Sequence, residues 1–351
     1  MTMTAQLLDT AVGPVNVRTD GRTAGEPVVF VHGNLSDARI FDEQADLLGE
    51  GFRAVAVDQR GFGSTPPRPV DATRGVRDLA DDVTAAIDAL DLGPVHLVGH
   101  SMGGGVVMQI ALDRPEAVRS LTLVAPISPY GFGATLPDGS PTTPDFAGSG
   151  GGGANPELVR LMREQERGGD HPASPRSVTR SIFFPSPDDI RDEDLIVDGI
   201  LAAAVGDDHY PGDSVPSDNW PGVAPGDRGI LNAISPKHFD LSGFGTAGLA
   251  VPVLWVHGAA DMVVNERSML DFGTLGEDGA VPGWPGADVH PPQPMVTQMR
   301  AVLERHAAGG ATVREEGWTD AGHFIFTQHP HRFAELLADH LQAAARPEPA
   351  S

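Results

Sequence analysis

A glycine-rich turn at residues 99–105, with the sequence GHSMGGG, holds a serine where a chain could present a nucleophile. The turn follows the apolar run PVHLV and precedes MQIALDRP, so it joins an expected strand to an expected helix. A dinucleotide-binding loop needs glycine where Ser101 stands. A phosphate-binding loop of the Walker type needs a lysine, and the chain's single lysine is Lys237. The residue types therefore favour a nucleophile over a phosphate cradle.

The pattern G-x-S-x-G, here Gly99 to Gly103, is typical of a serine at a sharp, strained turn between strand and helix. Small residues two positions to either side let the neighbouring backbone pass without a clash. A helix that begins after Ser101 offers unpaired N–H groups and a positive dipole end, so the backbone N–H of Met102 is the expected oxyanion donor. The alternative is a plain glycine turn, since such turns are common between strands and helices.

A serine hydroxyl is a weak nucleophile at neutral pH, so it needs a base and a third group that orients the base. Among thirteen histidines, His323 follows an expected last strand and precedes the last helix, which places it at the carboxyl end of a parallel sheet. The others nearby are assigned different roles. We expect His329 and His331 at the surface, His306 as a solvated residue at a helix C-terminus, and His257 in a structural role.

The elements that would position these residues are indicated by hydrophobic periodicity. Over residues 1–128, short apolar runs such as PVVFVHG at 26–32 alternate with amphipathic helical patterns. This alternation indicates parallel strands covered by helices on both faces. The pattern resumes at 251–345, so the sequence predicts one α/β core with a mostly parallel, doubly wound sheet.

Residues 129–250 interrupt this pattern and are predicted to form a mainly helical cap, or lid, inserted after the sixth strand. The segment begins with a stretch rich in Gly, Pro, Ser and Thr, which cannot be a central strand. Short helices are expected to begin at Asn155-Pro156, Ser174-Pro175 and Ser186-Pro187, where a capping side chain precedes a proline. We expect residues 346–351 to be a disordered tail.

Taken together, these motifs resemble the α/β-hydrolase fold family. VGHSMGGG is preceded by VHGN and DQRGFGST and followed by HGAAD and DAGHF, in the family's order. The resemblance implies an α/β-hydrolase core with a Ser-Asp-His triad and an inserted cap, of an esterase-like or lactonase-like kind. Family members that attack with a carboxylate, the haloalkane dehalogenases and epoxide hydrolases, are not expected, because the nucleophile position holds Ser101.

The family's acid position corresponds to Asp261, which ends VPVLWVHGAAD directly after a buried-looking strand. Some members take the acid from the preceding strand, but here that strand ends LVAPISPYG and carries no carboxylate. Asp261 is therefore favoured. The alternative is that Asp261 only caps a helix over MVVNERSMLDFG, because aspartate is a strong N-cap residue.

The resemblance also implies a second oxyanion donor, the backbone N–H of Asn34, with Leu35 as the alternative. DQRGFGS is expected to be a structural turn held by pairing of Asp58 with Arg60. Substrate groups are expected to meet residues at the sheet edge and in the cap, although an aromatic pair in a helix is more often core packing. The candidates are Leu35, Ile127, Phe183, Phe184 and Trp220, with Trp284 and His290 at the rim of the entrance.

Composition excludes several classes of function. Lys and Arg total 24 against 48 Asp and Glu, a net charge of −24 that repels nucleic acid and anionic lipid surfaces, so neither partner is expected. The chain has no cysteine, which excludes disulfides and thiolate chemistry. It also has no basic segment followed by a long apolar stretch, so we expect a cytoplasmic location by default. No metal or cofactor is expected, and a homo-oligomer is left open.

The leading hypothesis is a serine hydrolase that cleaves carboxylic esters or lactones of a fairly apolar substrate through an acyl-enzyme. It follows from the triad, the large cap and the few convergent charges. Carbon-carbon bond hydrolysis or perhydrolysis with the same triad is an alternative that the resemblance implies. A receptor-like protein that keeps the triad and uses the cap as a ligand-responsive lid is an alternative from a different class.

Overall fold

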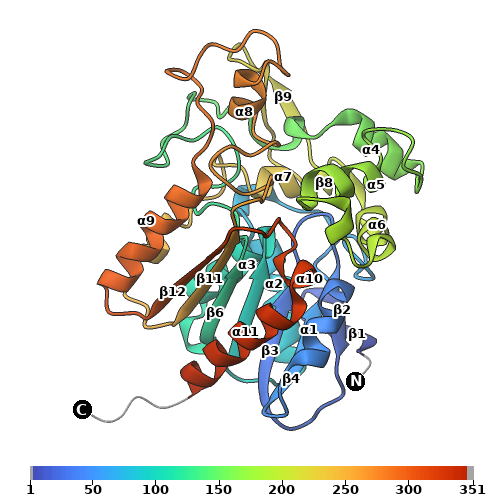
Figure 1. Cartoon of the computed structure of the whole chain (residues 1–351), viewed down its shortest axis with the longest axis vertical. Helices are drawn as coiled ribbons and strands as arrows, with labels where there is room; N and C mark the ends of the chain where they lie inside the picture. The colour runs from blue at the N-terminus through green and yellow to red at the C-terminus, as the bar shows by residue number, and fades with distance from the viewer. Residues whose placement is uncertain (1–2, 346–351) are drawn as a thin grey trace.

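The computed structural model describes residues 3–345, and its centre is an eight-stranded sheet in the order β1-β2-β4-β3-β5-β6-β11-β12 (Figure 1). β2 pairs antiparallel with both β1 and β4, and all other neighbours in the sheet are parallel. The prediction of a mostly parallel sheet is confirmed. The strands are β1 (Thr4–Thr10), β2 (Gly13–Thr19), β3 (Glu26–Val31), β4 (Phe52–Val57), β5 (Val95–His100), β6 (Val118–Val124), β11 (Val253–Gly258) and β12 (Val313–Trp318).

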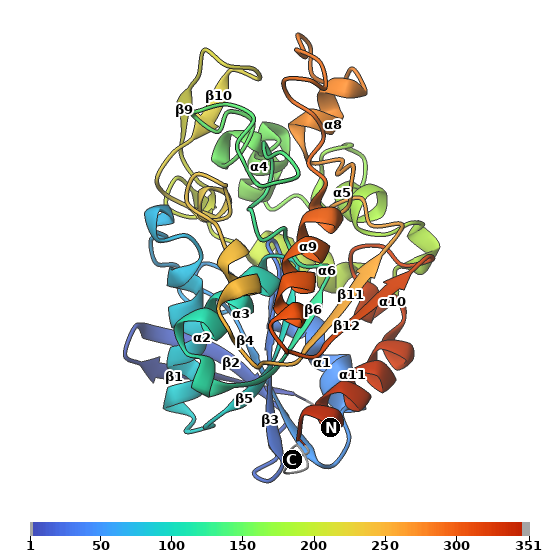
Figure 2. The same cartoon turned by 90° about the vertical axis from the view of Figure 1, so that its left-hand side faces the viewer.

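Helices cover both faces of this sheet, α2 and α3 on one side and α1 and α11 on the other (Figure 2). Every residue of β5 is buried, and so is every residue of β3 except Glu26, as expected for strands packed on both faces. The helices of the core, with short 3-10 helices marked η, are η1 (Ala38–Phe41), α1 (Asp42–Leu47), η2 (Ala72–Arg74), α2 (Arg77–Ala89), α3 (Met102–Asp113), η3 (Pro115–Ala117), α9 (Met295–Ala308), α10 (Ile325–Gln328) and α11 (Pro330–Ala345).

Most of residues 129–250 lie above the carboxyl ends of the strands (Figure 1). The helices there are η4 (Gly151–Gly153), α4 (Pro156–Arg163), α5 (Pro175–Val178), the π-helix η5 (Thr179–Phe183), η6 (Pro187–Asp189), α6 (Glu193–Ala202), α7 (Ile230–Ala233) and η7 (Ser242–Thr246). Two small two-stranded sheets accompany them, formed by β7 (Val205–Gly206) with β8 (Tyr210–Pro211) and β9 (Ser214–Pro216) with β10 (Val223–Pro225). The later helix α8 (Phe272–Glu277) also lies above the strand ends, and we call these elements together the upper layer (Figure 1).

The helix starts predicted in this segment are confirmed. The side chain of Asn155 accepts a hydrogen bond from the second residue of α4, and Ser174 and Ser186 cap α5 and η6 in the same way. Each cap is followed by proline, whose missing N–H would have no partner in the first helical turn. Local chemistry therefore decides these boundaries.

Two predictions about single residues of the core are wrong. His306 is buried rather than solvated, because its Nε2–H donates to the Val251 carbonyl 2.9 Å away and its ring packs on Phe244. Arg60 does not pair with Asp58. Its guanidinium pairs with Asp82 in α2, at 2.9 Å. The Asp58 carboxylate instead accepts N–H groups from Asn16, Ala38 and Ser64.

Within residues 3–345, no helix combines the length and apolar character needed to cross a membrane. The part of the chain that the structure describes also holds no group of three or more potential metal ligands. The acidic loop at 207–213 illustrates why, since Asp207, Asp208 and Asp213 all pair with Arg228. The predicted tail at 346–351 lies outside the described residues.

Asp271 is a buried carboxylate that caps α8 and also contacts the backbone of Gln293. One of its oxygens accepts the Gln293 N–H at 3.0 Å and the Thr274 N–H at 3.4 Å. The N–H groups of Gly273 and Ala134 are also near the carboxylate. Burial raises the pKa of Asp271 to about 6. Between about pH 4 and 6 the folded protein therefore holds a proton that the unfolded chain has released, so the free energy of unfolding falls as pH rises through this window.

We expect Asp271→Asn to stabilise the protein above pH 6 by about 1–3 kcal/mol, because the amide oxygen still accepts both N–H groups and no charge is buried. At pH 4.5 the gain should shrink, since the carboxyl is then protonated in the folded state. Urea unfolding at pH 4.5 and 7.5 measures the difference. An equal effect of the substitution at both pH values would contradict this interpretation.

Candidate active site

Ser101 stands alone between a strand and a helix. β5 ends at His100, α3 begins at Met102, and Ser101 between them has φ +54°, a conformation that side chains rarely adopt. The flanking glycines are sterically required. A Cβ on Gly99 would lie 2.4 Å from the Gly103 carbonyl oxygen, and one on Gly103 would lie 2.3 Å from the Val31 oxygen. The strained turn predicted from G-x-S-x-G is present.

Asp261 and His323 form a buried pair. Asp261 follows β11 and His323 follows β12, and the His323 Nδ1–H donates to Asp261 Oδ2 at 2.8 Å. Their side chains are 1% and 4% exposed. Because a carboxylate only accepts hydrogen bonds, this contact places the proton on Nδ1 and leaves a lone pair on Nε2. His323 is therefore in the tautomer that can act as a base.

The second oxygen of Asp261 is held by backbone. Oδ1 accepts the N–H groups of Val263 at 2.7 Å and Val264 at 3.0 Å. Residues 262–271 form turns and bends instead of the helix weighed as an alternative, and the next helix begins at Phe272. Asp261 therefore caps a turn and orients His323 at the same time.

Sheet order brings this pair to the serine, because β5, β6, β11 and β12 are consecutive neighbours whose carboxyl ends lie at one edge. The His323 ring lies 4.7 Å from the ring of His100, the residue before Ser101. Within residues 3–345 the Ser101 hydroxyl makes no hydrogen bond, so the Ser101–His323 contact is not closed in this structure. Such contacts often tighten only when substrate binds.

The loop after β3 passes directly beside the serine. A Cβ on Gly33 would lie 2.8 Å from Ser101 Cβ, and the Gly33 carbonyl is fixed by the Nδ1–H of His32 at 2.8 Å. Burial lowers the pKa of His32, so the ring stays neutral. Leu35, two residues after Gly33, has φ +53°. Neither Asn34 nor Leu35 donates its N–H to a backbone partner within the described residues, so both candidate donors remain.

Four of the predicted substrate contacts lie at or beside this site. The Ile127 N–H donates to the Ser101 carbonyl at 3.1 Å, and Leu35 is buried in the loop beside it. Phe183 ends the π-helix η5, and its carbonyl accepts the His323 N–H at 3.0 Å. Phe184 stacks on Phe324. Nothing in the sequence pointed to the Phe183 carbonyl as a partner of His323.

The other three predicted contacts form a cluster of their own. Trp220 packs edge-on against His290 at 4.9 Å, and the Trp284 Nε1–H donates to the His290 carbonyl at 2.9 Å. His290 is 1% exposed, so it does not rim an entrance, and burial lowers its pKa to about 4. Contact of this cluster with substrate stays a prediction.

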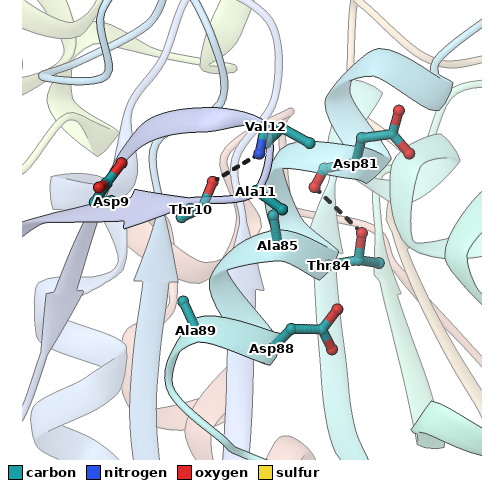
Figure 3. A pocket seen from close by; sticks show the side chains of 9 residues that line it. All are labelled: Asp9, Thr10, Ala11, Val12, Asp81, Thr84, Ala85, Asp88 and Ala89. Atoms are coloured by element: carbon teal, nitrogen blue, oxygen red, sulfur yellow. Dashed lines mark hydrogen bonds between the residues drawn. The ribbon is translucent and has the colours of Figure 1, made fainter.

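A surface hollow of about 390 Å³ lies away from the triad, between the β1–β2 turn and α2 (Figure 3). Figure 3 shows two hydrogen bonds in its wall, from the Val12 N–H to the Thr10 hydroxyl and from the Thr84 hydroxyl to the Asp81 carbonyl. Its chemistry-bearing side chains are three carboxylates, Asp9, Asp81 and Asp88. The hollow is lined by no serine or histidine, so the candidate site is at the sheet edge.

Fold and site together define a class of protein, the doubly wound α/β chain with a serine at the strand-to-helix elbow and a His-Asp pair at the same sheet edge. Sequence comparison agrees, since the profile described as the alpha/beta hydrolase fold matches residues 26–149, which include Ser101. The chain therefore has the alpha/beta hydrolase fold.

Individual relatives are similar over part or all of the chain. A 112-residue stretch is 40% identical to the "Putative carbamate hydrolase RutD" of Variovorax paradoxus, covering 32% of this chain and 42% of that protein. Among solved structures, a bromoperoxidase from Bacillus anthracis covers 97% of this chain and 100% of its own, with TM-score 0.61 and 18% identity. An esterase from Exiguobacterium antarcticum has the same coverages, with TM-score 0.58 and 22% identity. The chain spans less than half the length of the first curated relatives it matches.

Proposed function

We propose that this protein is a serine hydrolase that cleaves carboxylic esters or lactones of a fairly apolar substrate. The observation that carries the proposal is the 2.8 Å bond between His323 Nδ1 and Asp261, held against the strained turn that presents Ser101. This combination of a serine with an imidazole oriented by a carboxylate is what acyl transfer needs. The similarity to proteins named as esterases supports the proposal.

In this mechanism Ser101 Oγ bonds to the substrate carbonyl carbon as His323 Nε2 takes the hydroxyl proton. The resulting oxyanion is bound by the N–H of Met102, which has no partner in the first helical turn, and by that of Asn34 or Leu35. Asp261 stabilises the imidazolium. The C–O bond to the alcohol then breaks, and His323 returns its proton to the leaving oxygen. Water repeats both steps on the acyl-enzyme and releases the acid.

An apolar substrate is supported by the side chains beside these atoms. Leu35, Met102, Ile127 and Phe183 are all buried and carry no charge. A charged acyl group would lose its hydration against them without gaining a partner, which is unfavourable. The experiment must also test which bond is attacked, because similar proteins carry the names esterase, carbamate hydrolase and bromoperoxidase.

We expect saturable turnover of p-nitrophenyl esters or aromatic lactones, with kcat/KM rising as the acyl chain grows from acetate to butyrate, by up to about tenfold for two added methylenes. A panel of both substrate types, assayed with the wild type and with Ser101→Ala, measures this. Inactivity on every ester and lactone would overturn the proposal. Peroxide-dependent halogenation with acetate, cleavage of a diketone, or binding without turnover would then identify which alternative holds.

A further inference from the structure

His100, the residue before the nucleophile, is buried and has one specific partner. Its side chain is held at the end of β5, where its Nε2–H donates to the backbone carbonyl of His323 at 3.0 Å. The carbonyl accepts only, so the proton is on Nε2. The other ring nitrogen, Nδ1, has no partner within the described residues and faces Gly33, where an added Cβ would lie 3.2 Å away.

This contact matters because few hydrogen bonds hold the backbone of His323 in place. The segment after β12 belongs to no strand, so no sheet ladder holds it. On one side the His323 N–H donates to the Phe183 carbonyl, and on the other side the His323 carbonyl accepts from His100. Asp261 holds only the far end of the ring, at Nδ1. The two polar groups of the His323 backbone therefore have one partner each, and His100 supplies the one next to the nucleophile. The residues on either side are held separately, since the Gly322 N–H donates to Gln328 and the Phe324 carbonyl accepts from α10.

We propose that His100 is a positioning residue, which fixes the His323 backbone through its Nε2–H and thereby sets the distance between the base and Ser101. The inference deepens the proposed hydrolase function and rests on it. Its effect should fall on kcat, because a misplaced base weakens proton transfer in the transition state without removing a contact to the bound substrate.

The neutral state of His100 is part of this role. Burial, and next the neighbouring His323, lower the pKa of His100 well below its usual range. His323 becomes a cation during turnover, and a second cation with its ring 4.7 Å away would oppose that change. A neutral donor therefore holds the carbonyl without destabilising the imidazolium.

Two amide variants distinguish loss of the hydrogen bond to the His323 carbonyl from a general effect of replacing a buried side chain. In His100→Gln the amide nitrogen stands three bonds from Cβ, as Nε2 does, whereas in His100→Asn it stands two bonds away, as Nδ1 does. We expect His100→Asn to lower kcat for an ester by about 10- to 100-fold with KM within about threefold of wild type, and His100→Gln to retain kcat within about fivefold. Equal kcat losses in both variants, or wild-type kcat in His100→Asn, would overturn the proposal.

His96 offers a matched control on the same strand. It is also buried, but its ring contacts Ser120 and Glu26 and is separated from the triad by most of β5. The paired variants His96→Asn and His96→Gln should change the melting temperature and leave kcat unchanged. A loss of kcat in His96→Asn equal to that in His100→Asn would show that general destabilisation explains both, which also overturns the proposal.

A measurement on the wild-type protein remains decisive if the variants fail to fold. Long-range proton–nitrogen NMR of the histidine rings should show His100 as the neutral Nε2–H tautomer at neutral pH. An Nδ1–H tautomer or an imidazolium at neutral pH would overturn the inference. Failure of the hydrolase function itself has a different signature, since the wild type would then show no Ser101-dependent turnover while the tautomer stayed as expected.

Discussion

Replacing Ser101 with alanine is expected to lower ester turnover by about 10⁴-fold or more, to the level that the oxyanion donors and binding alone provide. The change removes one oxygen, and that oxygen makes no hydrogen bond within the described residues, so no structural contact is lost. Alanine keeps the same Cβ and the same strain at φ +54°. Steady-state kinetics on the most rapidly hydrolysed ester, with the melting temperature alongside, measure the effect.

Ser120 provides the matched control for this substitution. It is a fully buried serine in β6, and its hydroxyl contacts His96 well away from the triad. Ser120→Ala should lower stability by about 1 kcal/mol through the lost hydrogen bond and keep full turnover. Wild-type activity in Ser101→Ala would contradict the assignment of the nucleophile.

Asp261→Asn is expected to lower kcat by a similar factor, about 10⁴-fold, with little change in KM. The reason is that Asp261 Oδ1, the oxygen that does not contact His323, is held by the backbone. Asp261 Oδ1 accepts two backbone N–H groups, so the amide oxygen of asparagine must remain there and its NH₂ group must face His323 Nδ1. An NH₂ group only donates in this contact, so the imidazole shifts its proton to Nε2, where the base needs a lone pair. The serine proton then has no acceptor.

The control is the same chemical change at another buried carboxylate. Asp271→Asn alters stability as described above, but Asp271 contacts α8 and residue 293 rather than the triad, so its kcat should equal that of wild type. If Asp261→Asn kept more than about a tenth of wild-type kcat, orientation of His323 by Asp261 would not be a requirement for the reaction.

The parts of the fold that the sequence predicts well are those decided by neighbouring residues. The strained turn at Ser101 follows from glycines two positions away, and the helix starts at Asn155, Ser174 and Ser186 follow from a cap and a proline. Long apolar runs likewise identified the parallel strands. In each case the physical cause lies within a few residues of its effect.

The predictions that failed depended on partners distant in sequence. Arg60 pairs with Asp82 and not with nearby Asp58, and His306 is buried because Val251 supplies an acceptor. The antiparallel β1–β2 hairpin was not predicted, because β1 is an edge strand with mostly exposed residues and a weak apolar pattern.

The residues of the candidate site could be predicted from the sequence, but the contacts that support them could not. Residue types and order placed Ser101, Asp261 and His323 at one sheet edge, but the support for His323 comes from elsewhere. Its backbone partners, Phe183 and His100, are 140 and 223 positions away, and no local pattern connects them to it. Side-chain contacts of aromatic residues in the upper layer, such as Trp220, likewise depend on how distant loops meet.

The central claim is that Ser101 is a nucleophile activated by His323, and covalent labelling tests it most directly. Incubation with a fluorophosphonate followed by intact-protein mass measurement should show one adduct on the wild type, located at Ser101 by peptide mapping. Ser101→Ala should show none, and His323→Ala should react at least about 100-fold more slowly. An adduct of equal yield on Ser101→Ala, or no adduct on a folded wild-type protein, would contradict the account.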